Sequence, residues 1–223
     1  MVSLLDIIGP VMVGPSSSHT AGACRLGLLG RGLVSGTPQK AVIELHGSFA
    51  RTGEGHGTDK AIVAGLMGFR PDDERIRTAL QIAEHEELDY RFEKTTLSDS
   101  AHPNTVRMTL ERGDIKATLV GSSLGAGRVL VTEIDGYPVE VTGNFHTIVL
   151  VAEDRKGSIA RITQILADHD INIATLRLTR KYKGGDAFMV IECDDSPGEG
   201  VRDEIRALDW VRWARRLDKT GAA

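Results

Sequence analysis

The chain has 223 residues, a length that suits one large domain or two small ones. Its 27 lysines and arginines against 31 aspartates and glutamates give a net charge of −4, without the broad basic field that non-specific nucleic-acid binding needs. The two cysteines, Cys24 and Cys193, are too few for a disulfide framework, a cysteine-rich zinc site or a self-contained iron–sulfur cluster. With no leader-like segment and no apolar run of bilayer length, we expect a cytoplasmic protein with neither membrane nor nucleic-acid partners.

Residues 1–142 contain most of the glycines and predict an α+β domain. Apolar spacing predicts four helices: Ser3–Ile8, Thr20–Val34, Thr58–Met67 and Asp72–Glu86, the last with Ile76, Leu80 and Ile82 inward. Loops are expected at Gly9–Ser18 and at the glycine-rich Phe49–Gly57. Strands are predicted at Lys40–Leu45, Leu88–Lys94, Thr105–Leu110, Ile115–Val120, Arg128–Ile134 and Tyr137–Val141.

Residues 145–219 have clearer periodicities and predict a second domain. The order is strand Phe145–Ala152, helix Ser158–His169, a strand over residues 171–178, strand Ala187–Cys193, helix Pro197–Leu208 and strand Trp210–Leu217. The apolar alternation changes phase between Ile173 and Leu176, which predicts a bulge in the second strand. This βαββαβ order predicts a ferredoxin-like sandwich with two helices on one face of an antiparallel sheet.

The densest group of reactive side chains is Ser16, Ser17, Ser18, His19 and Thr20, at a junction between loop and helix. Ser18 or Thr20 would suit the helix N-cap, and free N–H groups at a helix start can hold a carboxylate or phosphate. A histidine beside that anion suits a general base. The alternative is a serine-rich cap with a solvated histidine.

Two further groups are weaker. His56 lies between Gly55 and Gly57, with Thr58 as a candidate cap and Asp59 in the first turn of the next helix; the alternative is a flexible loop. The residues around Asn104 form the third group, or simply a turn entering a strand. No histidine pair has the spacing of a helical zinc site, so we predict no metal held by this chain alone.

The residues Asp154, Gly157, Ser158 and Ile159, followed by Asn172 and Ile173, resemble the ACT domain, a small regulatory module of amino-acid metabolism. The resemblance implies effector binding at Asp154, Gly157, Ser158 and Ile159, and self-association through the domain. Lys156 stands where a proline is usual. A purely assembling role for the module remains the alternative.

Four motifs together resemble the β chain of the iron–sulfur-dependent L-serine dehydratases, or L-serine deaminases. They span residues 8–22, 46–50, 55–59 and 102–105, and Ala126 is a departure where a further glycine is usual. The N-terminal domain is also similar to a regulatory substrate-binding domain of phosphoglycerate dehydrogenases. The resemblance implies conversion of L-serine to pyruvate and ammonia without pyridoxal phosphate, by a [4Fe–4S] cluster that a separate α subunit ligates.

By the same resemblance, a substrate site would form with the α subunit. His19 is the candidate base, with His56 as the alternative. The candidate substrate-binding residues are Ser16, Ser18, Thr20, His56, Thr58, Asp59 and Asn104. The competing function is a non-catalytic subunit that binds an amino acid and only regulates or assembles its partner.

Overall fold

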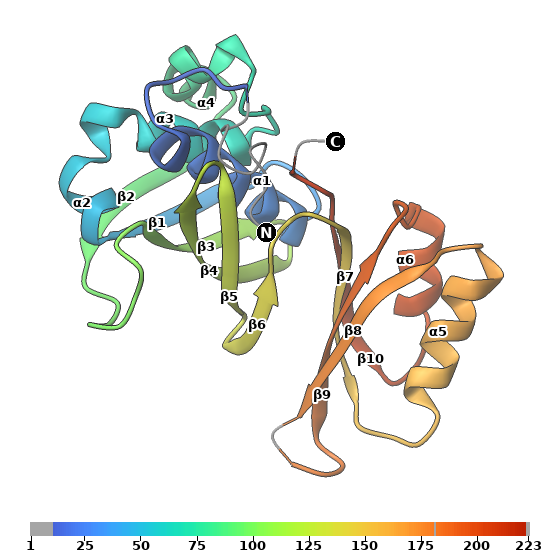
Figure 1. Cartoon of the computed structure of the whole chain (residues 1–223). Coiled ribbons are helices and arrows are strands. Elements are labelled where there is room, and N and C mark those ends of the chain that lie inside the picture. Colours follow the sequence, from blue (N-terminus) through green and yellow to red (C-terminus); the bar gives the residue numbers. More distant parts are fainter. Residues whose placement is uncertain (1–10, 181, 222–223) are drawn as a thin grey trace, which may run out of the picture. The chain divides into compact units, whose positions relative to one another are not determined.

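The computed structural model describes residues 11–180 and 182–221, so the expected helix Ser3–Ile8 lies outside the described residues. The chain forms two compact units (Figure 1). One comprises the residues up to Thr142 together with those from Thr220 onward, and the other comprises Gly143–Lys219. Within the described residues, every helix is too short or too polar to cross a bilayer.

The first unit is built on a six-stranded sheet in the order β2-β1-β3-β4-β5-β6. The β1–β2 pair is parallel, and the other neighbours are antiparallel. The strands are β1 (Lys40–His46), β2 (Asp89–Thr95), β3 (Thr105–Arg112), β4 (Ile115–Gly125), β5 (Arg128–Ile134) and β6 (Tyr137–Val141). These confirm the six predicted strands within two residues, except that β4 continues to Gly125. It continues because Gly121 and Ser122 pair with both β3 and β5, and this pairing outweighs their low strand propensity.

The helices of this unit are α1 (Ala23–Leu33), α2 (Gly47–Thr52), α3 (Thr58–Leu66) and α4 (Ala79–His85). Helices α1 and α3 cross at Gly27 and Gly65, where the backbones approach unusually closely. A Cβ on Gly65 would lie 2.1 Å from the Cys24 carbonyl oxygen, and one on Gly27 would lie 2.3 Å from that of Ile62. The two glycines therefore allow the close contact that brings the first turns of α1 against the last turns of α3.

Two predictions for this unit are wrong in part. The expected loop Phe49–Gly57 contains α2 and a 3-10 turn, Glu54–His56, because its glycines follow the helix instead of interrupting it. The expected helix Asp72–Glu86 is a 3-10 turn, Glu74–Thr78, followed by α4. This break in the helix buries Ile76, Ala79 and Ala83, and leaves Leu80 and Ile82 only partly buried.

A buried arginine on α1 holds three remote backbone segments of the first unit. Arg25 is 7% exposed, and its guanidinium donates to the carbonyl oxygens of Gly127 and Thr142 and to the Thr220 hydroxyl. Thr142 precedes the second unit in the chain, and Thr220 follows it. Arg25 therefore binds to α1 the two points of the first unit at which the chain leaves for the second unit and returns from it.

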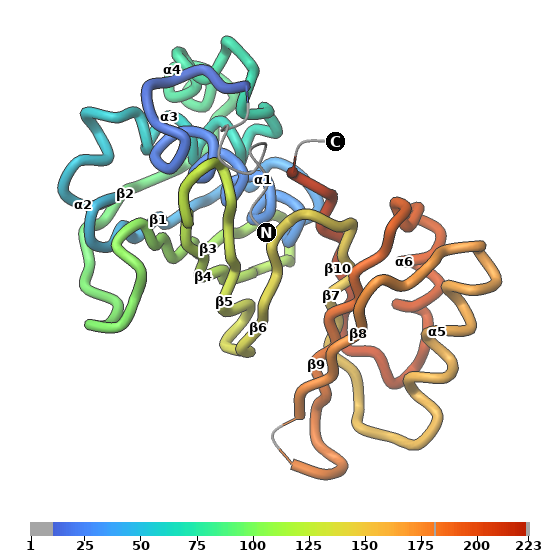
Figure 2. The backbone as a smooth tube through the Cα atoms, in the orientation of Figure 1, coloured from blue at the N-terminus to red at the C-terminus, as the bar shows by residue number. Residues whose placement is uncertain are grey.

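The second unit confirms the predicted βαββαβ order. Its elements are β7 (His146–Glu153), α5 (Ser158–Asp168), β8 (Ile173–Arg180), β9 (Asp186–Cys193), α6 (Glu199–Arg206) and β10 (Val211–Leu217). The sheet order is β10-β7-β9-β8, and both helices cover one face of it (Figure 1). The first and last strands, β7 and β10, lie side by side (Figure 2). The register of β8 shifts between Ile173 and Thr175, which confirms the predicted bulge.

The core of the second unit is aliphatic, as the low aromatic content requires. Apolar side chains from β7 and β9 pack against those of α5 and α6, including Ile148, Leu150, Ile162, Ile165, Met189, Ile191 and Ile205. Alternate residues of each strand supply this core, which explains why the strand periodicity could be read from the sequence.

Candidate functional site

The serine-rich segment begins a helix with a π-helical turn, Ser17–Gly22, that continues into α1. The N-cap is Ser16, not Ser18 or Thr20 as predicted: its Oγ accepts the His19 N–H at 3.2 Å. The prediction was wrong because the wider π turn starts the helix earlier than apolar spacing indicated. Short π segments recur at functional sites, where they redirect a side chain. Here the turn carries His19.

Hydroxyl groups surround the imidazole of His19. Its Nδ1 lies 3.4 Å from the Ser16 Oγ, and its Nε2 lies 3.3 Å from both the Ser48 Oγ and the Thr52 Oγ1. The ring of Phe49 meets it edge to face, with centroids 5.3 Å apart. We call Ser16, His19, Ser48, Thr52 and His56 the His19 cluster.

Thr52 orients both histidines of this cluster. Its hydroxyl donates to the Ser48 carbonyl oxygen at 3.0 Å, so its lone pairs face the Nε2 of His19 as acceptors. Its carbonyl oxygen, 2.8 Å away, accepts from the Nδ1 of His56. These contacts place the proton of a neutral His19 ring on Nε2 and that of a neutral His56 ring on Nδ1. The free lone pairs are then on Nδ1 of His19 and Nε2 of His56.

The cluster disfavours a proton on His19. Burial lowers the pKa of His19, the charge of the neighbouring His56 lowers it further, and a hydrogen bond with the Ser48 backbone opposes the shift. The ring centroids of His19 and His56 are 5.0 Å apart. These effects favour the unprotonated form of His19, which is the form that a general base requires.

A cavity of about 660 Å³ adjoins the cluster. Its polar lining comprises Thr20, Glu54, His56, Lys60 and Arg77, beside the backbone of Gly14. Thr20 is 2% exposed and its Oγ1 has no hydrogen-bond partner among the described residues. Such a buried hydroxyl can hydrogen-bond to a ligand. Arg77 already pairs with Glu74 at 3.3 Å, and Glu54 adds a negative charge to the lining. Lys60 is therefore the cation of this wall that is best suited to bind a carboxylate.

The remaining predicted residues are placed differently. Thr58 is fully buried as the first residue of α3, whose N-cap is the left-handed Gly57, so Thr58 is not the cap that was predicted. Asp59 follows it in the first turn, with one carboxylate oxygen buried. Ser18 lies beside the β4–β5 turn at Gly125. Asn104 follows Pro103, whose carbonyl oxygen accepts the Ser48 N–H at the start of α2.

In the second unit, the predicted effector turn is already hydrogen-bonded within the fold. The Asp154 carboxylate accepts from Arg180 at 2.6 Å and from the Gly184 N–H at 2.9 Å. The Gly184 N–H and then Arg180 hold the pKa of Asp154 below its usual range. Gly157 is the left-handed N-cap of α5, Ser158 is buried, and Ile159 is 43% exposed. Only Ile159 of these side chains extends well into solvent.

Four functional candidates were missed from sequence: Ser48, Thr52, Lys60 and Arg77. One signal was available, because Ser48, Thr52 and His56 recur every four residues, the spacing of one helical face. The glycines between them led to the prediction of a loop. Nothing comparable in the sequence brings Lys60 and Arg77 together, since their proximity depends on how α3 packs against the 3-10 turn Glu74–Thr78.

The cysteines do not fit an iron–sulfur cluster ligated by this chain. Cys24 is buried and its S–H donates to the Phe69 carbonyl oxygen, whereas Cys193 is buried in the other unit. Burial raises the pKa of Cys24 to about 12 and that of Cys193 to about 11, away from the thiolate that a cluster needs. Among the described residues, no group of three histidines, cysteines or acids is placed to hold a metal ion.

Comparisons with known proteins agree with both units. The family model "Serine dehydratase beta chain" matches residues 3–133, and the ACT domain model matches residues 146–209. The probable L-serine dehydratase β chain of Bacillus subtilis is 42% identical over 92% of this chain and 93% of its own. The L-serine dehydratase β chain of Peptoniphilus asaccharolyticus is 36% identical, over 97% of this chain and 98% of its own.

A more distant relative confirms the similarity to phosphoglycerate dehydrogenases. The D-3-phosphoglycerate dehydrogenase of Synechocystis is 26% identical over 84% of this chain and 34% of its own length. The two family models together cover most of the present sequence, and the two dehydratase chains align with nearly all of it. The chain therefore belongs to the serine dehydratase β chain family and carries an ACT domain at its C-terminal end.

Proposed function

We propose that this chain is the β subunit of an L-serine dehydratase that converts L-serine to pyruvate and ammonia together with a separate α subunit. The reaction removes the Cα proton and the Cβ hydroxyl as water, leaving 2-aminoacrylate. The imine tautomer of this product then takes up water and releases ammonia and pyruvate. The observation that carries the proposal is the placement of His19, whose pKa is lowered, among hydroxyl groups and next to His56, which lines a cavity together with Lys60.

In this proposal His19 is the base that accepts the Cα proton. Its Nε2 donates to Thr52, so Nδ1 carries the lone pair and lies next to the Ser16 hydroxyl. His56 is the alternative base, since its Nδ1 is bound to the Thr52 carbonyl and its Nε2 is free to accept. The two histidines lie too close for both to be protonated without mutual repulsion, so one proton accepted by the pair is favoured over two.

The substrate carboxylate is assigned to the hydroxyls and N–H groups at the start of the π turn. Ser16, Ser18 and Thr20 supply the hydroxyls, and the unpartnered Thr20 Oγ1 supports this assignment. Lys60 supplies a positive charge on the same cavity wall. Asn104 follows Pro103, whose carbonyl oxygen accepts the Ser48 N–H at the start of α2. Thr58 and Asp59 begin α3, next to Gly57 and Lys60 of the cavity lining.

The [4Fe–4S] cluster is assigned to the α subunit, where it would act as a Lewis acid toward the substrate hydroxyl. The two buried, separated cysteines support a cluster held outside this chain. We further propose that the enzyme works without pyridoxal phosphate and in the cytoplasm.

Residues 145–219 are proposed as a regulatory ACT domain, and residues 1–142 as the domain that contributes to catalysis. Effector binding is assigned to the turn at Asp154, Gly157, Ser158 and Ile159, where the exposed Ile159 supports an external contact. Self-association is assigned to the exposed edges of the four-stranded sheet, β8 and β10.

Anaerobic co-purification of this chain with an α subunit, followed by a serine-to-pyruvate assay of each chain and of the complex, tests the proposal. We expect activity only from the complex. Full activity of the α subunit alone would replace the catalytic role with a regulatory or assembly role. Activity of this chain alone would refute the division of the site between two subunits.

A further inference from the structure

A second hollow lies at the carboxyl ends of the parallel strands β1 and β2. Its volume is about 710 Å³. His46 ends β1 and pairs with Thr95 of β2, while Lys94 pairs with Leu45. Ligands of α/β proteins bind preferentially outside the carboxyl ends of parallel strands, where strands and following helices diverge. We call this hollow, lined by residues 46, 47, 50, 51 and 94–96, the α2 hollow.

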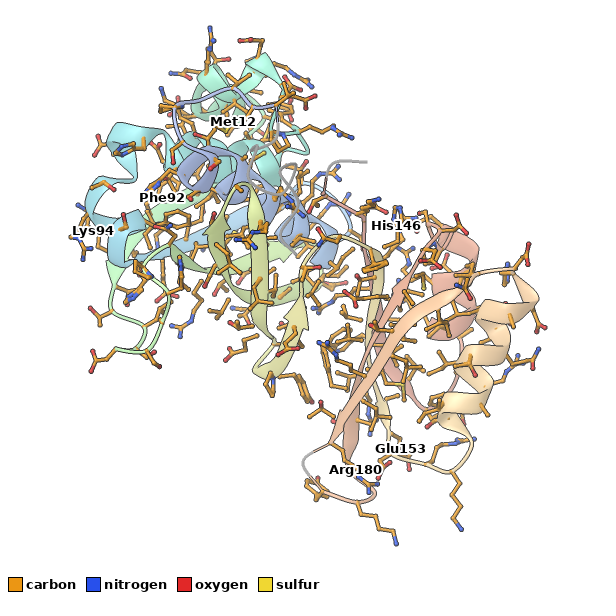
Figure 3. The ribbon with its side chains drawn as sticks, in the orientation of Figure 1. Met12, Phe92, Lys94, His146, Glu153 and Arg180 are labelled. Carbon is orange, nitrogen blue, oxygen red and sulfur yellow. The ribbon has the colours of Figure 1, made fainter. Side chains whose placement is uncertain are left out.

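The charged side chains of the α2 hollow are all basic. Arg51 comes from α2 and Lys94 from the end of β2, which lies beside that helix (Figure 3). No aspartate or glutamate is among the residues that line the hollow. Neither Arg51 nor Lys94 has an ion-pair partner within residues 11–180 and 182–221. Two like charges around one concavity repel each other, and a bound anion would relieve this repulsion.

The neutral lining groups can also donate to an anion. The Nδ1 of His46 accepts the Leu97 N–H at 3.3 Å, so a neutral His46 ring carries its proton on Nε2. Thr95 and Thr96 add hydroxyl groups. A guanidinium, an ammonium, an imidazole N–H and two hydroxyls together match the acceptor oxygens of a phosphate or carboxylate.

Helix α2 separates this hollow from the His19 cluster. Ser48 and Thr52 contact His19 from one face of the helix, whereas Ala50 and Arg51 line the hollow on another. The start of α2 is already occupied: the Ser48 N–H donates to the Pro103 carbonyl oxygen at 2.7 Å. The α2 hollow therefore depends on side chains of two elements and does not rest on the helix terminus.

We propose that the α2 hollow binds a small oxyanion, the phosphate or carboxylate group of a metabolite. A small ligand fits because Arg51 and Lys94 both line the same concave surface. The inference is independent of the proposed dehydratase activity, since it concerns binding to this chain alone.

Titration of the full-length chain with inorganic phosphate, and separately with malonate, tests this site by amide and imidazole NMR shifts. We expect saturable shifts at Gly47, at Thr95 and in the His46 ring. The tighter of the two probes identifies the preferred group. In the double variant Arg51→Gln/Lys94→Gln, the affinity should fall at least about tenfold, because two charged contacts are lost.

The charge control is Lys40→Gln/Arg91→Gln, which removes the same net charge from strands β1 and β2 but outside the hollow. This variant should bind the preferred probe within about twofold of the parent chain. The proposal is overturned if neither probe gives saturable shifts around the hollow, or if both double variants weaken binding equally, which would indicate a diffuse charge effect.

Discussion

The imidazole rings of His19 and His56 lie with their centroids 5.0 Å apart and their planes tilted by 39°. One histidine comes from the π turn before α1, and the other from the 3-10 turn before α3. Thr52 contacts both rings, through its hydroxyl and its carbonyl oxygen. Because the two rings share this partner and the charge of His56 lowers the pKa of His19, a change at His56 should alter the protonation of His19.

The first prediction concerns the pH dependence of the complex with the α subunit. A positive charge on His56 lowers the pKa of His19, so His56→Gln should raise it toward its ordinary value. A base must be unprotonated, and the acid limb of kcat/KM should therefore move to higher pH. The measurement is a pH profile of kcat/KM for both forms. An acid limb that stays in place or moves to lower pH would contradict the coupling.

The second prediction concerns the base itself. His19→Gln should reduce kcat by about 10²–10⁴-fold, the usual contribution of a general base. Under the proposal that the α subunit ligates the cluster, the visible absorbance of the cluster in the complex should not change. His85→Gln, at an exposed histidine on α4, is the control and should retain parental turnover. A near-normal kcat for His19→Gln would transfer the role to His56.

The third prediction concerns Thr52 as a positioning residue. Thr52→Val keeps the shape of the side chain but removes the hydroxyl that accepts from His19. Loss of one such contact should lower kcat about tenfold, with KM nearly unchanged if only the base is misplaced. Thr52→Ser, which keeps the hydroxyl, should restore most of the activity. Equal losses in both variants would point to a packing effect of the methyl group.

The fourth prediction concerns the crossing of α1 and α3. Gly65→Ala would place its Cβ 2.1 Å from the Cys24 carbonyl oxygen and force the helices apart. We expect a loss of about 1–3 kcal/mol in the free energy of unfolding, as for other overpacked sites. Gly55→Ala is the control, since no atom lies within 4 Å of its added Cβ. Urea unfolding of both variants gives the comparison, and equal stabilities would contradict the tight crossing.

The fifth prediction concerns Ala126, which lies in the turn between β4 and β5. Its φ of 50° lies in the left-handed region, which costs an L-residue about 1 kcal/mol or more. Ala126→Gly should therefore raise the free energy of unfolding by about 0.5–1 kcal/mol. Ala126→Val should lower it, because a β-branched side chain tolerates this conformation less well. Changes of the same sign in both variants, measured in urea, would argue against backbone strain at this turn.

The local spacing of apolar residues along the sequence was sufficient to predict most of the helices and strands. Strands such as β7 and β9 were predictable because one or both of their faces are buried, which leaves alternating or continuous apolar runs in the sequence. Helix α5 was predictable because Ile162, Ile165 and Leu166 repeat at helical spacing. The register shift in β8 could also be read, since a bulge exchanges the faces to which successive side chains point.

Local pattern failed where glycines and short helices meet. Helix α2 is only six residues long, and its position depends on the Pro103 carbonyl oxygen that accepts the Ser48 N–H from a remote segment. Gly47 adopts a φ of 59°, and a Cβ there would lie 2.5 Å from that same oxygen. No short-range signal in the sequence describes such a contact.

The sequence by itself determined the family and the two-part organisation of the secondary structure, and it proposed His19 as the candidate base, because motifs and periodicities are local along the chain. Only the tertiary structure decided which groups surround that histidine. Ser48, Thr52 and His56 reach His19 because Gly27 and Gly65 let α1 and α3 cross closely and because the Pro103 carbonyl anchors α2. The pKa of His19, the lone pair it presents and the charge of the neighbouring cavity all depend on these long-range contacts, since burial and charge proximity are properties of the packed chain.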